Sequence, residues 1–285
     1  MTMRFILTSL VSSLVFMIGH GQSIQFPTLS PISKISQEIG LTQIELSYSR
    51  PSAKGRTVFG ELVPYGQTWR TGANASTKLT FTEDVIVAGN LLPAGTYALY
   101  TIPKRDIWTM IIHKKTDLRS IAGDRVKPEN DAFRFDVKPS FHPTYMETFT
   151  IQFGHLTTNS CDIQILWENT MVSFSIVVDV DSKIERQITE VMKDPENVNH
   201  RILFRCAEYY LHNGKNLDRA QDWIDRALIK SENNFRYGLL KSKIYASQGN
   251  IPSAKSMVEQ AHEWAKVANN ANYMEQTMLY RQSLD

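Results

Sequence analysis

The stretch from Tyr48 to Lys78, YSRPSAKGRTVFGELVPYGQTWRTGANASTK, decides how the rest of the chain is interpreted. It shows neither the two-residue period of a strand nor the period of about 3.6 residues of a helix. Long irregular connections inside compact domains are generally either functional or disordered. Disorder is disfavoured here by residues that normally become buried, namely Val58, Phe59, Leu62, Val63, Tyr65 and Trp69. The stretch is therefore predicted to be an ordered, functional loop.

Short strands are predicted on both sides of this loop. Before it, Ile44, Leu46 and Tyr48 share one face of an alternating segment. After it, similar segments recur at residues 79–82, 84–87, 96–102, 108–113, 133–137, 149–153, 163–167 and 172–178. The run LPAGTY at 92–97 resembles a tyrosine corner, in which a Tyr hydroxyl bonds to backbone a few residues upstream. About nine short strands separated by turn signals predict an antiparallel β sandwich or jelly roll over residues 22–180.

The period changes at Asp181, and the rest of the chain predicts an all-α domain over residues 181–285. Helices are expected at residues 183–193, 199–213, 216–230, 233–248, 251–268 and 271–282. Tyr210 and Tyr245 lie 35 residues apart, and Ala220 and Ala254 lie 34 apart. This spacing of small and aromatic residues resembles the helical-hairpin repeat of tetratricopeptide proteins, although only two units are visible.

The first residues predict a secretory signal peptide over residues 1–21. Arg4 precedes an apolar run of fourteen residues, Phe5–Ile18, and Gly19-His20-Gly21 supplies small residues for cleavage. The alternative, an N-terminal anchor helix, is less favoured because the run is short for a membrane span. The processed chain is expected to be exported, periplasmic or extracellular, without an integral membrane segment.

Composition excludes several function classes. The chain has 31 basic and 29 acidic residues, so a nucleic-acid partner is not predicted. Its two cysteines, Cys161 and Cys206, are too few for a disulfide scaffold or a zinc ribbon, and two buried thiols are favoured over a bridge. No metal-binding or phosphate-binding motif is found, and no cofactor is predicted.

The loop contains the side chains that best suit ligand binding. Arginine forks bind carboxylate or phosphate groups, while Tyr, Trp and Asn suit sugars. The predicted ligand-binding residues are Tyr48, Arg50, Arg56, Tyr65, Trp69, Arg70 and Asn74. In the alternative interpretation, the arginines pair with Glu45, Glu61 or Asp84 to fix the loop, and Trp69 is a core residue. The sequence leaves both interpretations open.

The same stretch carries motifs of a known family. They are Ser49-Arg50-Pro51, Gly55-Arg56, Phe59-Gly60, Val63-Pro64-Tyr65-Gly66, Trp69-Arg70-Thr71-Gly72-Ala73-Asn74 and Ala94-Gly95-Thr96-Tyr97. With them, roughly residues 30–178 resemble the bacterial family called domain of unknown function 2911. Lys78 departs from the family pattern at a strand start, where it changes little. The resemblance implies a β domain and an exported location, and it implies no activity.

Two function classes follow from these observations. The first is a non-enzymatic exported protein that binds a small polar or anionic ligand, such as a glycan, and docks a partner protein through its helical tail. The second is a hydrolase or lyase acting on an acidic sugar, with Arg70 and Tyr48 as electrophile and acid. Such an enzyme needs a base near the arginines, for which Glu61, Asp84 and Glu168 are the acidic residues available.

Overall fold

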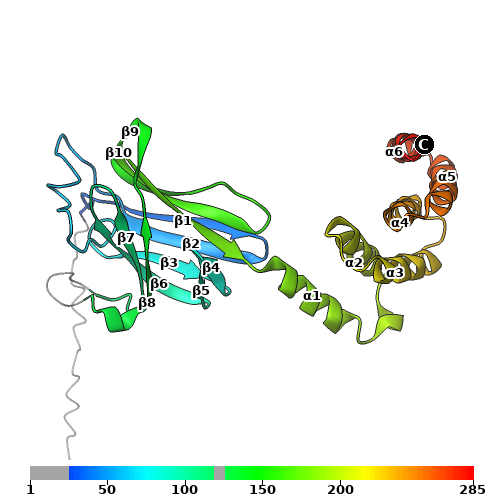
Figure 1. Cartoon of the computed structure of the whole chain (residues 1–285), viewed down its shortest axis with the longest axis horizontal. Coiled ribbons are helices and arrows are strands. Elements are labelled where there is room, and N and C mark those ends of the chain that lie inside the picture. Colours follow the sequence, from blue (N-terminus) through cyan, green and yellow to red (C-terminus); the bar gives the residue numbers. More distant parts are fainter. Residues whose placement is uncertain (1–25, 119–125) are drawn as a thin grey trace, which may run out of the picture. The chain divides into compact units, whose positions relative to one another are not determined.

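The computed structural model describes residues 26–118 and 126–285. Within them the chain divides into two compact units, with the boundary between Val178 and Asp179 (Figure 1). The first unit, called the β unit below, contains the strands, and the second, the helical unit, contains the α-helices. The signal peptide predicted for residues 1–21 lies outside the described residues.

The described part of the β unit contains ten strands in two sheets. The strands are β1 (Ile32–Ile39), β2 (Thr42–Ser49), β3 (Thr77–Phe81), β4 (Val85–Val87), β5 (Asn90–Leu92), β6 (Gly95–Pro103), β7 (Trp108–His113), β8 (Asp131–Val137), β9 (Ser140–Gly154) and β10 (Ser160–Val178). All pairs are antiparallel. One sheet has the order β1-β2-β3-β6-β7-β8, and the other has the order β5-β4-β10-β9. This order confirms the predicted antiparallel sheets but does not confirm a jelly roll.

The strand count differs from the predicted nine for three local reasons. The sequence of β1 has no alternation of apolar residues, because Ile32 and Ile35 fall on opposite faces, so periodicity did not predict it. β5 has only three residues. The predicted turn at 168–170 is wrong, because β10 runs through it with register shifts and with Glu168 at a φ of 51°. A bulge thus bends one long strand where the sequence suggests two.

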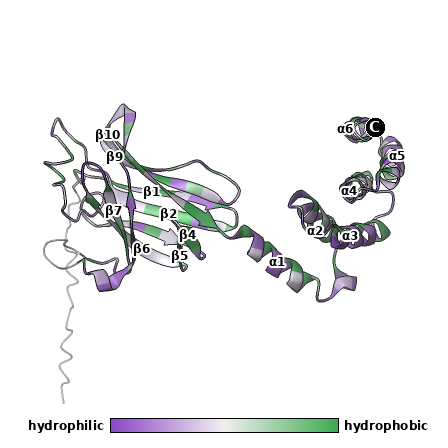
Figure 2. Ribbon diagram, viewed as in Figure 1, coloured by the Kyte–Doolittle hydropathy of each residue, from purple (hydrophilic) through white to green (hydrophobic). Residues whose placement is uncertain are grey.

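Apolar side chains of the two sheets meet between them. Tyr48 of β2 and Phe149 of β9 have ring centroids 5.8 Å apart, and Phe135 of β8 and Phe174 of β10 lie at 5.3 Å. Hydrophobic and hydrophilic residues alternate along the strands (Figure 2). The predicted tyrosine corner is present, because the Tyr97 hydroxyl donates to the Pro93 carbonyl at 2.9 Å.

The helical unit contains the six predicted helices. They are α1 (Val180–Val191), α2 (His200–His212), α3 (Leu217–Lys230), α4 (Phe235–Ser247), α5 (Ile251–Val267) and α6 (Ala271–Gln282). An asparagine side chain caps the first turn of each helix from α2 to α6 by accepting backbone N–H groups. Gly238 of α4 allows close packing on α5, since a Cβ there would lie 2.9 Å from Ala261 Cβ.

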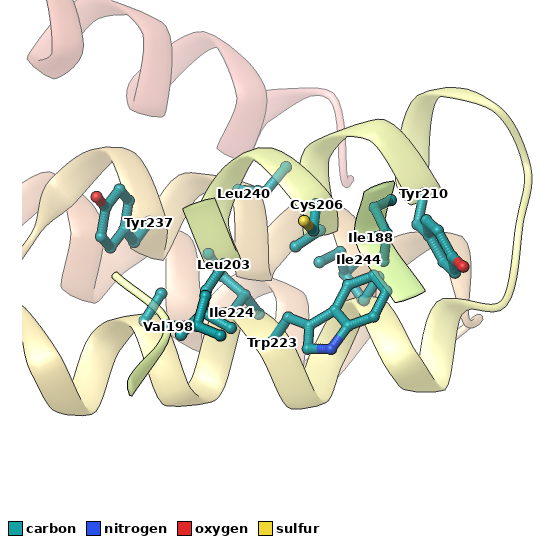
Figure 3. Packing of buried hydrophobic residues seen from close by; sticks show 13 residues of the cluster. Ile188, Val198, Leu203, Cys206, Tyr210, Trp223, Ile224, Tyr237, Leu240 and Ile244 are labelled. Atoms are coloured by element: carbon teal, nitrogen blue, oxygen red, sulfur yellow. The ribbon is translucent and has the colours of Figure 1, made fainter. Parts of the chain in front are cut away.

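A cluster of buried residues in the helical unit extends from α1 to α4. Trp223 packs edge-on against Tyr210 with centroids 4.7 Å apart (Figure 3). Leu203, Ile224 and Ile244 are fully buried in the same cluster. The hydroxyl of Tyr210 donates to Glu185 of α1 at 2.7 Å. These contacts fix α1 on the helices that follow it.

Both cysteines are free and buried, one in each unit. Burial raises the pKa of the Cys161 thiol and of the Cys206 thiol to about 11. Because the thiolate is the nucleophile, both thiols should resist a thiol-specific reagent such as dithionitrobenzoate at about pH 8. Denaturant should then release two equivalents of product. Rapid labelling of the native protein would contradict this expectation.

Candidate functional site

The loop between β2 and β3 is fixed on strands of both sheets. Trp69 exchanges two backbone hydrogen bonds with Thr101 of β6, at 2.7 and 2.9 Å. On the other side, Ala53 N–H donates to the Glu147 carbonyl of β9, and Phe149 N–H donates to the Pro51 carbonyl, both at 2.8 Å. The backbone polar groups of this irregular stretch are thus paired with strands. The loop is ordered, as the sequence predicts.

Trp69 lies in an aromatic cluster rather than on a free surface. Its ring stacks on Trp167 with centroids 5.9 Å apart and meets Phe149 edge-on at 5.2 Å and Trp108 at 6.3 Å. Phe59 contacts the rings of Trp69, Trp108 and Trp167. The indole N–H of Trp69 donates to the Gly72 carbonyl at 2.9 Å, and the residue is 8% exposed. This geometry supports the core interpretation of Trp69.

The three loop arginines bind carbonyl and hydroxyl oxygens. Arg50 donates to the Phe149 carbonyl at 3.0 Å and to the Thr150 hydroxyl at 2.7 Å. Arg56 donates to the carbonyls of Ala53 and Ser52, both at 2.9 Å, and Arg70 donates to the Asn74 carbonyl.

None of the ion pairs found among the described residues includes these arginines. The predicted pairs with Glu45, Glu61 or Asp84 are therefore absent from residues 26–118 and 126–285, and each guanidinium charge is left without a carboxylate partner.

Tyr48 and Asn74 also have structural contacts. The buried Tyr48 hydroxyl donates to the Ile151 carbonyl at 2.9 Å and accepts the Ile151 N–H at 3.0 Å. The Asn74 amide donates to the Ser30 carbonyl at 3.2 Å and to the Ser49 hydroxyl at 3.3 Å. These side chains fix the two ends of the loop.

A pocket of about 330 Å³ opens at the loop and is called the loop pocket below. Of the seven predicted ligand-binding residues, Arg56 and Trp69 line it. Its other lining residues are Leu29, Ser30, Pro51, Ser52, Lys54, Leu62, Val63, Gly72, Ala73 and Trp167. Tyr65 lines a different pocket, and Tyr48, Arg50, Arg70 and Asn74 are not among the residues that line the loop pocket. The structure thus does not gather the seven residues around one pocket.

The acidic residues predicted as bases lie outside the loop pocket. Asp84 accepts the Ala94 N–H at 2.8 Å, and Glu168 accepts the Val58 N–H at 3.1 Å. Glu147, which the sequence did not single out, accepts the Lys54 N–H at 2.7 Å. Glu61 is exposed. Asp84, Glu147 and Glu168 therefore hold turns and loop backbone.

The sequence did not predict a second group of polar side chains, which the structure buries in the β unit. Ser76, Tyr100, His113 and Asp131 each carry a buried polar atom for which the described residues supply no hydrogen-bond partner. His113 Nε2 lies 4.0 Å from Asp131 Oδ1. Burial raises the pKa of the Tyr100 hydroxyl above its usual value, and nearby Ser76 and Arg70 offset part of this increase. A period-two pattern can place Tyr100, His113 and Asp131 on strands, and Ser76 directly before β3, but it does not show that their polar atoms become buried.

Comparisons with known proteins identify a family and nothing more specific. A family model described as "Protein of unknown function (DUF2911)" matches residues 30–176. Neither a curated protein nor a solved structure matches the chain.

In residues 26–118 and 126–285 no set of three or more His, Cys, Asp or Glu side chains could hold a metal ion. No helix of that part is both long and apolar enough to span a membrane.

Proposed function

The chain belongs to this family, DUF2911, which is described as of unknown function, and we propose a function from the loop pocket, the predicted signal peptide and the helical unit. The protein is an exported, non-enzymatic binding protein, and its loop pocket holds a small anionic ligand. Export follows from the predicted signal peptide, residues 1–21. The helical unit, with its tetratricopeptide-like spacing, docks a partner protein.

The observation that carries this proposal is the positive charge at the pocket, which forms no ion pair among the described residues. Lys54 and Arg56 both line it, and its described lining residues include no Asp or Glu. Two backbone carbonyls hold the Arg56 guanidinium through Nε and Nη2, and among the described residues Nη1 has no hydrogen-bond partner. An arginine oriented in advance loses little side-chain freedom when it binds an anion.

The pocket favours an anion over a neutral sugar. A sugar ring would need an open aromatic face for stacking. Trp69 and Trp167 line the pocket, but they stack on each other and pack against Phe149. Both are buried, so little ring surface is left for a ligand. Ser30 and Ser52 line the pocket with the two cations, and the Ser52 hydroxyl is hydrogen-bonded to the Thr148 hydroxyl at 2.9 Å.

The alternative of a hydrolase or lyase has less support. General acid–base chemistry needs a titratable group within hydrogen-bond reach of the substrate. The described lining of the loop pocket contains no Asp, Glu, His or Cys. Tyr48, proposed as the acid, uses its hydroxyl for two backbone hydrogen bonds, and Arg70 does not line the pocket.

The test is the substitution Arg56→Gln, measured by calorimetric titration of the processed chain with sulfate, phosphate and citrate. Loss of a charge-assisted hydrogen bond should weaken binding about tenfold or more. Thermal stability should change little, because Arg56 is exposed. Lys138→Gln removes the same charge from an exposed residue outside the pocket and should bind like the unaltered protein. Equal affinity of Arg56→Gln, or no binding by the unaltered protein, would exclude the proposal.

A further inference from the structure

A second pocket, of about 240 Å³, lies where the loop, the β6–β7 turn and the bulged end of the β9–β10 pair come together. It is called the Phe141 pocket below. Tyr65 comes from the loop, Lys104 and Arg105 from the turn, Phe141 from β9 and Asn169 from β10. The remaining lining residues are Phe59, Trp108, Pro139, Ser140 and Thr170.

Two aromatic residues of this pocket, Phe141 and Tyr65, are more open than the tryptophans of the loop pocket. Phe141 is 76% exposed, which is unusual for a large apolar side chain in a strand. Tyr65 is half-buried, and the Arg105 guanidinium lies 5.4 Å from its ring centroid. An exposed ring beside a cation is a surface on which the apolar face of a sugar ring can stack.

The charge of the Phe141 pocket is positive and uncompensated. Lys104 and Arg105 are both exposed, and no ion pair between described residues includes either of them. The described lining contains no carboxylate. A ligand that complements these cations carries an acidic group.

Polar side chains complete the pocket. The Asn169 amide donates to the His142 carbonyl at 2.9 Å, which fixes the amide and leaves its oxygen as an acceptor. The Ser140 hydroxyl donates to the Met171 carbonyl at 3.3 Å and retains its lone pairs as acceptors. Thr170 adds a further hydroxyl to the lining. Acceptors and hydroxyls beside an exposed ring suit a ligand with several hydroxyl groups.

We propose that the Phe141 pocket binds an acidic sugar residue, a uronic acid in a saccharide chain, whose ring stacks on Phe141 and whose carboxylate faces Lys104 and Arg105. This second site does not rest on the anion site of the loop pocket, because the two pockets have no described lining residue in common. Their ligands also differ, since the first site needs only an anion and the second needs a ring as well.

The experiment titrates the processed chain with a short oligogalacturonate, a neutral galactan oligomer of the same length and a polyglutamate peptide. Phe141→Ala and Arg105→Gln should each weaken oligogalacturonate binding about tenfold. The neutral oligomer should bind more weakly than the acidic one. Tyr145→Ala removes another exposed ring of β9, outside the pocket, and should have no effect. Both Phe141 and Arg105 are exposed, so melting curves should show folded proteins.

Several outcomes would overturn the proposal. Oligogalacturonate could fail to bind the unaltered protein, or could bind Phe141→Ala as tightly. Polyglutamate could bind equally well and depend on Arg105 but not on Phe141, which would indicate an acidic peptide instead. Loss of oligogalacturonate binding in Arg56→Gln alone would assign the saccharide to the loop pocket. Phosphate binding that depends on Arg56 would support the anion site of the loop pocket whichever of these four results is obtained.

Discussion

Replacing Trp69 with alanine should lower the free energy of unfolding of the β unit by about 3–5 kcal/mol. The indole packs against four aromatic rings that belong to the loop, to β7, to β9 and to β10. Removing it leaves a cavity where both sheets and the loop meet, and the Gly72 carbonyl loses its N–H donor. Trp69→Phe retains one ring and should cost clearly less.

Chemical denaturation followed by near-ultraviolet circular dichroism measures this effect, because the packed aromatic cluster contributes to that signal. Trp69→Ala should also lose the signal's fine structure in the native state. A midpoint equal to that of the unaltered protein, together with lost anion binding, would show instead that Trp69 contacts the ligand. The two interpretations that the sequence left open are thus separated by one variant.

Tyr48→Phe should lower the free energy of unfolding by about 2–4 kcal/mol, a large effect for the loss of one oxygen atom. The Tyr48 hydroxyl satisfies both the N–H and the carbonyl of Ile151 in β9. β9 is an edge strand of its sheet; on its free side the loop backbone pairs with it at Glu147 and Phe149, and on that side no described strand pairs with it at Ile151. Phenylalanine would leave both backbone groups buried without a partner.

Thermal melts of Tyr48→Phe and Tyr97→Phe provide a matched comparison. The Tyr97 hydroxyl donates to a single exposed carbonyl, that of Pro93, and its loss should cost about 1 kcal/mol or less. Equal effects of the two substitutions would show that the Tyr48 hydroxyl does not hold the edge of β9. An unchanged melting temperature of Tyr48→Phe together with weakened ligand binding would show that Tyr48 contacts the ligand, as the sequence predicts.

Much of the fold follows from sequence periods. Alternation in β2 places Tyr48 on the same face as Ile44 and Leu46, and all three are buried there. Helical periods and an asparagine before most helices locate α1–α6. Periodicity fails where its assumptions fail, as in β1, which has no apolar face, and at Glu168, where a bulge resembles a turn.

The site was less predictable because the loop has no period. Residue type indicated which side chains could bind a ligand, but it could not show which of them are buried and which are exposed. Arg50 and Arg56 donate to backbone carbonyls, which every residue has, so the sequence does not show which carbonyl an arginine binds. Lys54 and Phe141 were not singled out, since their open surroundings depend on residues far away in the chain.

The hydrogen bonds that fix the loop also constrain how the chain can fold. Tyr48 pairs with a residue 103 positions later, Arg50 with one 99 later and Val58 with one 110 later. A ribosome releases the chain from its N-terminus, so the loop emerges long before β9 and β10 exist to receive it. Closing such distant contacts is slow. Until residue 168 has been synthesised, Val58 lacks the carboxylate of Glu168 that accepts its N–H, and Trp69 lacks the Trp167 ring on which it stacks, so the loop cannot reach its final contacts earlier.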